Sequence, residues 1–297
     1  MKNWIQAARP RTLPLALASI LMGSFLAAAA GSFSWKIFGL AALTTILLQV
    51  LSNFANDYGD AVSGIDNAER KVATRAVQSG AITKKQMRNA IIIAGILALI
   101  SGIYLLYEAL KNADSQTFLV FLGLGLLSIA AAITYTVGKR PYGYMGLGDV
   151  SVLIFFGWVG VLGTYYLHTH TLDWLLLLPA SSCGLFAVGV LNINNIRDIE
   201  NDARSGKNSI PVRLGKPKAV VYHWFLLGGG LFCAIIYTLL NAGSLWQWIF
   251  LIAMPLLLKI GRGVSAGQTP AEIDPYLKQM ALTTLLFVLT FGLGQLL

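Results

Sequence analysis

The chain has 297 residues, of which 56% are hydrophobic and only 12% are charged. A soluble globular protein carries about 25% charged residues, so the composition excludes a soluble multidomain protein. The formal net charge of +9 would suit a nucleic-acid-binding protein, unless the basic residues are placed as in a membrane protein. Cys183 and Cys233 each lie inside a long apolar run, which argues against a structural disulfide and against a zinc site.

Apolar stretches predict nine membrane-spanning helices. The hydrocarbon core of a bilayer is about 30 Å thick and needs roughly 20 apolar residues per helix. We therefore expect an all-α, polytopic membrane bundle around a central cavity, with residues 1–297 forming a single domain. In chain order the expected spans are 12–30, 36–55, 89–107, 117–137, 150–167, 172–193, 219–240, 245–260 and 279–297.

The basic residues predict how the bundle is oriented. If the N-terminus is cytoplasmic and nine spans alternate, all of the 22 basic residues except Lys36 and Lys111 fall on the cytoplasmic side. Cytoplasmic loops of membrane proteins carry this excess of Lys and Arg. The pattern predicts a cytoplasmic N-terminus and an outer C-terminus. The positive charge is then a signal of topology, and we expect no nucleic-acid partner.

Two cytoplasmic segments, after the second and the sixth spans, begin with Asn and Asp and continue into Lys and Arg. Their spacing of three or four residues places the first group on one face of a helix, and Asp198 and Asp202 lie one turn apart. The two sites are four spans apart, which suggests two similar parts with motifs near 53–66 and 192–207. The first group is Asn53, Asn56, Asp57, Asp60 and Asp66, and the second is Asn192, Asn194, Asn195, Asp198 and Asp202.

The composition of these clusters indicates a site for Mg²⁺ and a diphosphate. Like charges one turn apart repel, and ionisable groups at a membrane are usually functional. Mg²⁺ prefers oxygen ligands and is commonly held by carboxylates together with phosphates of a substrate. Basic residues that could bind a diphosphate stand close behind: Lys71, Arg75, Arg197 and Lys207. The alternative is a pair of hydrophilic loops with helix caps.

The motifs resemble those of the UbiA superfamily of intramembrane prenyltransferases, which have nine helices and two Asp-rich motifs. Asn56-x3-Asp60 is similar to the first motif and Asp198-x3-Asp202 to the second, while Tyr135-x3-Lys139 is similar to the family's YxxxK element. The family's third carboxylate in the first motif is replaced by Gly64, with Asp66 two residues later.

Four longer segments look like the 1,4-dihydroxy-2-naphthoate polyprenyltransferase branch: ARPRTLPLALASILMGS, QVLSNFANDYGDAVSGID, KRPYGYMGLGDVSVLIFFG and NNIRDIENDARSGKNSIPVRLG. The resemblance implies transfer of a polyprenyl group from its diphosphate to the naphthoate, with loss of CO₂ and diphosphate, giving demethylmenaquinone. It implies a multi-pass enzyme of the bacterial inner membrane whose active site faces the cytoplasm. Another aromatic acceptor, such as 4-hydroxybenzoate, and a cation-coupled transporter stay open as alternatives, and so does the oligomeric state.

The resemblance also implies roles for individual residues. Asp60, Asp198, Asp202 and Asn56 would be catalytic, and with Asp57 and Asp66 they would hold Mg²⁺. Contacts to the substrates are expected from Asn53, Arg75, Tyr135, Lys139, Lys207, Arg11, Arg140 and Asn195.

Several further positions lie outside the two clusters. Arg11 and Arg140 stand apart from the clusters and are candidates to bind the carboxylate of the acceptor. Asp149 could orient the aromatic substrate or pair with Arg140, and both readings stay open. His168 and His170 are expected to be solvated residues of an outer loop.

Overall fold

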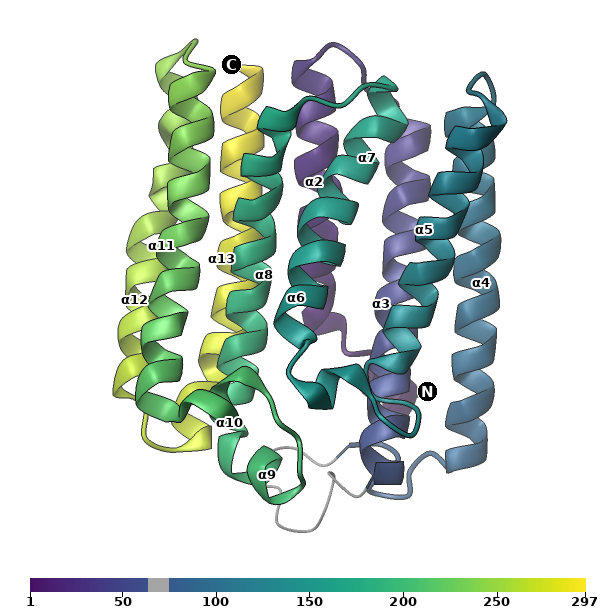
Figure 1. Cartoon of the computed structure of the whole chain (residues 1–297), viewed down its shortest axis with the longest axis vertical. Coiled ribbons are helices and arrows are strands. Elements are labelled where there is room, and N and C mark those ends of the chain that lie inside the picture. Colours follow the sequence, from purple (N-terminus) through teal and green to yellow (C-terminus); the bar gives the residue numbers. More distant parts are fainter. Residues whose placement is uncertain (64–74) are drawn as a thin grey trace.

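A computed structural model describes residues 1–63 and 75–297, and every regular element in these two ranges is a helix (Figure 1). Nine helical segments in this part of the chain are long and apolar enough to cross a membrane, which confirms the predicted number and the all-α class. The helices that make up the spans are α2 (Leu13–Ala29), α3 (Trp35–Ser63), α4 (Lys84–Leu110), α5 (Ser115–Thr134), α6 (Gly148–Val152) with η3 (Leu153–Val159) and α7 (Gly160–Thr169), α8 (Leu177–Arg197), α11 (Lys216–Leu240), η5 (Leu245–Ala253) with α12 (Met254–Ala266), and α13 (Pro270–Leu296).

Short helices join these spans. Most of them lie at one end of the bundle, the lower end in Figure 1, where α3 also ends. They are α1 (Lys2–Ala8), η1 (Pro10–Thr12), η2 (Tyr142–Met145), α9 (Ile199–Arg204) and α10 (Ile210–Leu214), while η4 (Trp174–Leu176) precedes α8 at the other end. The N-terminus lies towards the lower end and the C-terminus at the upper end, as an odd number of spans requires.

Several spans are longer than predicted, and the second and the ninth extend furthest into the polar end. Span two was expected to end at residue 55, but α3 continues to Ser63 and carries the first cluster on its last turns. Span nine was expected from residue 279, but α13 begins at Pro270, where the Thr269 side chain caps it by accepting a hydrogen bond from the Glu272 amide. Hydropathy alone places a helix end where the polar residues begin, although these residues continue the helix.

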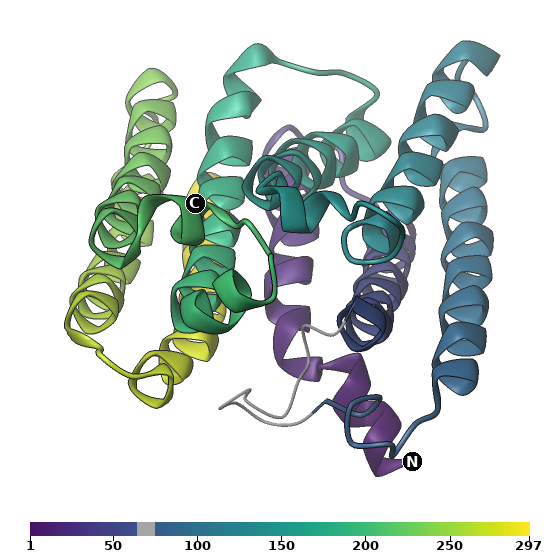
Figure 2. The ribbon, with the colours of Figure 1, turned by 60° about the horizontal axis from the view of Figure 1, so that its bottom comes forward.

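The apolar core is divided, and this division leaves room for a cavity. The largest cluster joins α2, α7, α8, α11, α12 and α13 around buried rings that include Phe186, Phe287 and Phe291. A second cluster joins α1, α3 and α4 around Leu51 and Met87. Figure 2 shows the bundle with the lower end turned forward, with α1, next to the N-terminus, beside the end of α3.

The fifth span is interrupted by a π-helix, η3, that lies against α2 and α8. Within it, the Phe156 carbonyl accepts a hydrogen bond from Ser19 Oγ of α2 at 2.5 Å. Gly157 approaches α8 so closely that a Cβ there would lie 2.8 Å from the Ala180 carbonyl oxygen. π-helical turns occur often at functional sites, and Phe155 and Phe156 of this one line the cavity described next.

Candidate active site

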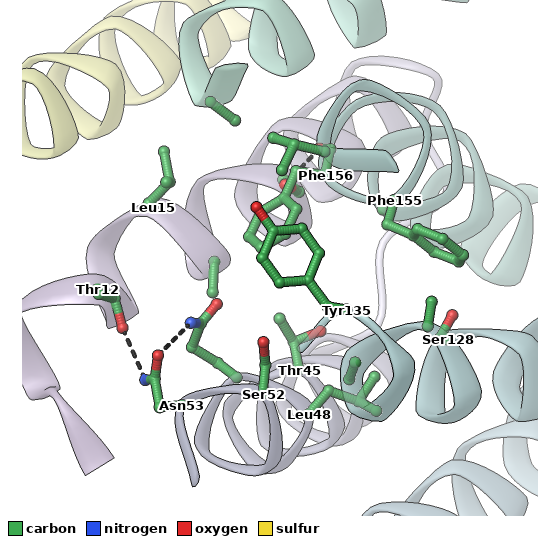
Figure 3. A pocket seen from close by; sticks show the side chains of 18 of the residues that line it. Thr12, Leu15, Thr45, Leu48, Ser52, Asn53, Ser128, Tyr135, Phe155 and Phe156 are labelled. Atoms are coloured by element: carbon green, nitrogen blue, oxygen red, sulfur yellow. Dashed lines mark hydrogen bonds between the residues drawn. The ribbon is translucent and has the colours of Figure 1, made fainter. Parts of the chain in front are cut away.

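A cavity of about 1430 Å³ lies between the helices. Its walls come from α2 to α8 and α13, and most lining side chains along the spans are apolar. In Figure 3, Tyr135 stands among lining residues of other elements, with Ser52 and Asn53 of α3 on one side and Phe155 and Phe156 of η3 on the other. Polar and charged residues line the part nearest the lower end. The site is therefore a long apolar chamber with one polar end.

The helix α3 brings the first cluster to this polar end. Asn53, Asn56, Asp57 and Asp60 all line the cavity, because residues three or four apart share one face of a helix. The Asn53 side chain donates to the Ala8 carbonyl at 2.8 Å and to Thr12 Oγ1 at 3.1 Å. Asn56 Oδ1 accepts a hydrogen bond from Thr136 Oγ1 at 3.1 Å. These contacts fix two amides of the cluster against the neighbouring segments.

Asp60 is held by partners that are distant in the sequence. Arg75 forms a salt bridge with Oδ2, and the Tyr144 hydroxyl donates a hydrogen bond to Oδ1. The Arg75 and Asp60 side chains are only 15% and 9% exposed. Burial, together with the nearby charge of Asp60, raises the pKa of Tyr144, so the phenol stays protonated and donates. Both oxygens of Asp60 are thus engaged at the cavity wall.

The second cluster contributes to the cavity through α8. Asn194, Asn195 and Arg197 line it, and Asn195 Oδ1 is buried without a hydrogen-bond partner. Asp198 follows the last residue of the helix and forms a two-point salt bridge with Arg197. Arg197 Nε lies 2.8 Å from Asp198 Oδ1, and Arg197 Nη2 lies 2.7 Å from Asp198 Oδ2. Arg197 also binds Asp274 of α13 at 2.5 Å. The second cluster is therefore tied to the start of the last span.

Asp202 lies behind the cavity wall. Its carboxylate is 2.8 Å from Lys207 Nζ, and the Lys207 side chain itself lines the cavity. Burial raises the pKa of Asp202, and the Lys207 ammonium opposes this effect. Asp198 and Asp202 are not among the lining residues, in contrast to Asp57 and Asp60. The structure thus brings the two clusters together, but with the second one turned partly into the protein.

The remaining predicted residues divide into two groups. Arg11 and Tyr135 line the cavity, whereas Lys139 and Arg140 are exposed outside it. Asp149 is buried and accepts a hydrogen bond from the Tyr222 hydroxyl at 3.0 Å, whereas Arg140 is exposed, so the structure gives Asp149 a different partner from the suggested Arg140. Asp66 and Lys71 lie outside the described residues.

The histidine expectation needs a correction. His170 is exposed as expected, but His168 is buried at the end of α7. The Ser34 amide donates to its Nδ1 at 3.2 Å, and Nε2 lies 3.3 Å from Ser24 Oγ. The prediction of a solvated loop failed because α7 extends to Thr169 and carries His168 against α2.

Sequence reasoning missed several lining residues. Tyr142 and Tyr144 come from the linker before α6, and Asp274 and Lys278 from the first turns of α13. The paired tyrosines in KRPYGYMG, close after the YxxxK element, were an available signal. The α13 residues had none, because that segment was read as a loop.

The donor set fits Mg²⁺ only in combination with a substrate. Among the described residues, no three acidic, His or Cys side chains are gathered into a ready-made metal cluster. The cavity nevertheless offers the carboxylates of Asp57 and Asp60 and the unsatisfied amide oxygen of Asn195. Mg²⁺ is typically held by one or two carboxylates plus phosphate oxygens and water. Such residues suit a metal that arrives with a diphosphate.

Comparison with known proteins identifies the family. The chain is 50% identical over 296 residues to a protein of Escherichia coli (strain K12) named 1,4-dihydroxy-2-naphthoate octaprenyltransferase, covering 98% of this chain and 96% of that one. A UbiA homolog from Aeropyrum pernix K1 has the same fold, with a TM-score of 0.68 at 17% identity and 96% of both chains covered. A UbiA homolog from Archaeoglobus fulgidus bound to DMAPP and Mg²⁺ gives a TM-score of 0.61 at 14% identity, over 97% and 99% of the two chains. A model of the UbiA prenyltransferase family matches residues 16–292, so the chain belongs to the UbiA prenyltransferase family.

Proposed function

We propose that this protein transfers a polyprenyl group from its diphosphate to 1,4-dihydroxy-2-naphthoate with loss of CO₂ and diphosphate, giving demethylmenaquinone in its reduced, quinol form. The sequence identity of 50% to the Escherichia coli protein, over 98% of this chain, supports this acceptor. The observation that carries the proposal is an apolar chamber whose one polar end is lined by Asp57, Asp60 and Asn195 from two spans. An isoprenoid diphosphate has the matching shape, with an apolar tail and an anionic head.

The polar end would hold the diphosphate together with Mg²⁺. Ligands for the metal come from Asp57 and Asp60, with Asn56 and Asn195 as neutral oxygen donors, and from Asp198, Asp202 and Asp66 of the two motifs. The basic residues at the cavity wall, Arg75 and Lys207, are paired with Asp60 and Asp202. When those carboxylates turn to a cation, both side chains can bind diphosphate oxygens through charge-assisted hydrogen bonds. The relative from Archaeoglobus fulgidus, bound to DMAPP and Mg²⁺, supports this choice of metal.

The reaction breaks the bond between the allylic carbon and the diphosphate oxygen and forms a carbon–carbon bond to the naphthoate ring. The ring then loses its carboxylate as CO₂, and the electron pair of that broken bond returns to the ring, so both hydroxyl groups are kept. When bound, Mg²⁺ supplies positive charge that offsets the charge developing on the leaving diphosphate. Arg75 and Lys207 stabilise the same charge from the protein side. The apolar walls, including Phe155 and Phe156, exclude water from the allylic cation. The Tyr135 ring, which projects into the chamber, offers a π-face to this cation.

The acceptor carries a carboxylate and needs a cation at the cavity wall. Arg11 lines the cavity from η1, just before α2, while the alternative, Arg140, is exposed outside it. We therefore assign the acceptor carboxylate to Arg11. With the N-terminus cytoplasmic, this polar end faces the cytoplasm, where the water-soluble naphthoate is available. The bacterial inner membrane is the corresponding location.

The test of the function is acceptor competition with the purified protein in detergent. We expect a prenylated naphthoate and release of CO₂ and diphosphate with 1,4-dihydroxy-2-naphthoate, and no product with 4-hydroxybenzoate. A chelator should stop turnover, and added Mg²⁺ should restore it. Efficient prenylation of 4-hydroxybenzoate would contradict the assigned acceptor, and turnover that survives thorough chelation would contradict the assigned metal.

A further inference from the structure

The linker between α5 and α6, residues 135–147, touches both acidic motifs. Its short helix η2 lies at the lower end of the bundle, between the end of α3 and the segment that holds α9 and α10 (Figure 1). On the side of the first motif, the Tyr144 hydroxyl donates to Asp60 Oδ1 and lies 3.2 Å from Ser63 Oγ. These contacts join positions 84 and 81 residues apart in the chain.

The backbone of the same linker is bonded to the second motif. The Asn208 amide donates to the Tyr144 carbonyl at 2.8 Å. Arg213 Nη2 donates to the Met145 carbonyl at 2.5 Å, and its Nε donates to the Asn208 carbonyl at 3.1 Å. Asn208 directly follows Lys207, the partner of Asp202.

Gly146 allows this close fit. Its φ of +78° lies in the left-handed region that favours glycine. A Cβ at this position would lie 2.9 Å from Arg213 Nη2 and 2.9 Å from the Asn208 carbonyl oxygen. A side chain here would push the linker away from the second motif.

We propose that Tyr144 is a positioning residue that fixes Asp60 and holds the two acidic motifs in register. Its hydroxyl donates a hydrogen bond to Oδ1 of Asp60, while Oδ2 is paired with Arg75. Oδ2 is therefore the oxygen that leaves Arg75 and binds the cation. The Tyr144 carbonyl ties the same residue to the segment of Lys207 and Asp202. The proposal rests on the function assigned above, since it concerns the site that binds the metal and the diphosphate.

The consequence is a specific effect on metal binding. Without the hydroxyl, Asp60 can rotate to bring both oxygens to Arg75, and a cation then competes with a two-point salt bridge. A hydrogen bond to a charged group contributes enough to change an equilibrium roughly tenfold or more. Removal of the hydroxyl should therefore weaken Mg²⁺ binding without unfolding the protein.

The experiment is a thermal-stability titration of the purified chain with Mg²⁺ at a fixed concentration of inorganic diphosphate. For Tyr144→Phe we expect the Mg²⁺ concentration that gives half of the stabilisation to rise about tenfold. Prenyl transfer should lose kcat, and the KM for the naphthoate should stay near that of the native protein. Arg213→Gln, which loosens the linker but keeps the hydroxyl, should raise the Mg²⁺ midpoint by less.

Tyr222→Phe is a matched control. It also removes a hydroxyl that donates to a buried carboxylate, Asp149 Oδ2 at 3.0 Å, but neither residue lines the cavity. We expect its Mg²⁺ midpoint to stay within about twofold of the native one.

Three results would overturn the inference. A native midpoint in Tyr144→Phe means that the hydroxyl does not position Asp60, and the proposed function then still stands. If Tyr144→Phe does not fold, Arg213→Gln decides. A Mg²⁺ midpoint equal to that of the native chain in this variant would show that the linker does not hold the two acidic motifs in register. Absence of any Mg²⁺-dependent stabilisation in the native chain overturns the metal site of the proposed function, and the role of Tyr144 with it.

Discussion

A carboxylate buried beside a membrane needs a cationic or hydrogen-bonding partner, and the two acidic motifs meet this need differently. Asp60 takes its partners, Arg75 and Tyr144, from segments that follow it by 15 and 84 residues. Asp198 is bound by its own neighbour, Arg197, whose side chain is only 3% exposed. Removing one member of a buried pair leaves an uncompensated charge, which is strongly destabilising. Substitution by asparagine keeps the shape and an oxygen that accepts a hydrogen bond from the arginine, but it removes the compensating charge.

The first prediction concerns Asp60. Asp60→Asn keeps the shape but removes the charge that Arg75 and a cation require, so we expect prenyl transfer to fall about 100-fold or more, as for the loss of a key electrostatic contact. The measurement is kcat/KM for the prenyl diphosphate with purified protein. Asp198→Asn should act in the same direction, since it belongs to the second motif.

The control for this pair is Asp114→Asn at the opposite end of the bundle. Asp114 caps α5 by accepting from the Thr117 amide at 2.8 Å, and Asn caps a helix about as well. Its activity should match that of the native chain. If both Asp60→Asn and Asp198→Asn retain more than about a tenth of native activity, the assignment of metal ligands is wrong. Asp66→Asn should be milder than Asp60→Asn, and an equal loss would make Asp66 a full ligand.

The second prediction separates two arginines by their position. Arg11 lines the cavity and Arg140 is exposed outside it. Arg11→Gln should raise the KM for the naphthoate roughly tenfold, the expected cost of one charge-assisted contact, and change the KM for the prenyl diphosphate much less. Arg140→Gln is the matched control and should leave both constants unchanged. A selective effect of Arg140→Gln on the naphthoate, with none from Arg11→Gln, would reverse the assignment.

At the scale of elements, the sequence predicts spans well and their polar ends poorly. Nine apolar stretches are enough to predict nine spans, because burial in lipid demands long apolar helices. The helical spacing of Asn53, Asn56 and Asp60 also predicts their common face. Hydropathy, however, ends the second span before Asn56 and begins the ninth span only after Lys278, whereas in the structure polar residues continue both helices into the site.

The contacts of the linkers could not be read from the sequence. The bond between Tyr144 and Asp60 joins segments 84 residues apart, and nothing in either segment specifies the other. The same holds for Arg197 and Asp274, which are 77 residues apart. Such pairs depend on how the spans pack, and that packing is set by close approaches such as the one at Gly157.

The third prediction tests this packing at the π-helix. In Gly157→Ala the new methyl group would lie 2.8 Å from the Ala180 carbonyl oxygen and 3.0 Å from Gly184 Cα, so η3 and α8 must move apart. Overpacking of this kind costs about 1–3 kcal/mol, and thermal denaturation in detergent should show a lower Tm.

Gly125→Ala in α5 is the matched control for this change. Apart from the backbone of its own helix, no atom lies within 4 Å of the added methyl group, and Ala favours a helix over Gly by about 1 kcal/mol. Its Tm should be equal to or above that of the native chain. An equal loss of Tm in both variants would mean that the effect comes from glycine itself rather than from the contact with α8.

At the scale of the whole molecule, both acidic motifs and most basic segments share one end. The ends of α3 and α8, the linker before α6, and the turn between α12 and α13 all lie at the lower end in Figure 1. This is the distribution that the positive-inside rule predicts for a cytoplasmic N-terminus. The similarity of the two parts around 53–66 and 192–207 stays a prediction. Asp60 and Asp198 have different binding partners, so the two motifs correspond in their position in the bundle and not in their contacts.

The last prediction tests this orientation by labelling single cysteines in intact cells with a membrane-impermeant thiol reagent. Ser79 and Thr171 are both exposed and lie in connections at opposite ends, Ser79 before α4 and Thr171 before η4. We expect Thr171→Cys to react in intact cells and Ser79→Cys to react only after the membrane is opened. The native chain is the control, because Cys183 is buried and Cys233 half-buried within spans, where a charged reagent does not reach. The reverse labelling would place the acidic motifs outside the cell, away from a cytoplasmic supply of naphthoate, and would contradict the proposed topology while leaving the fold unchanged.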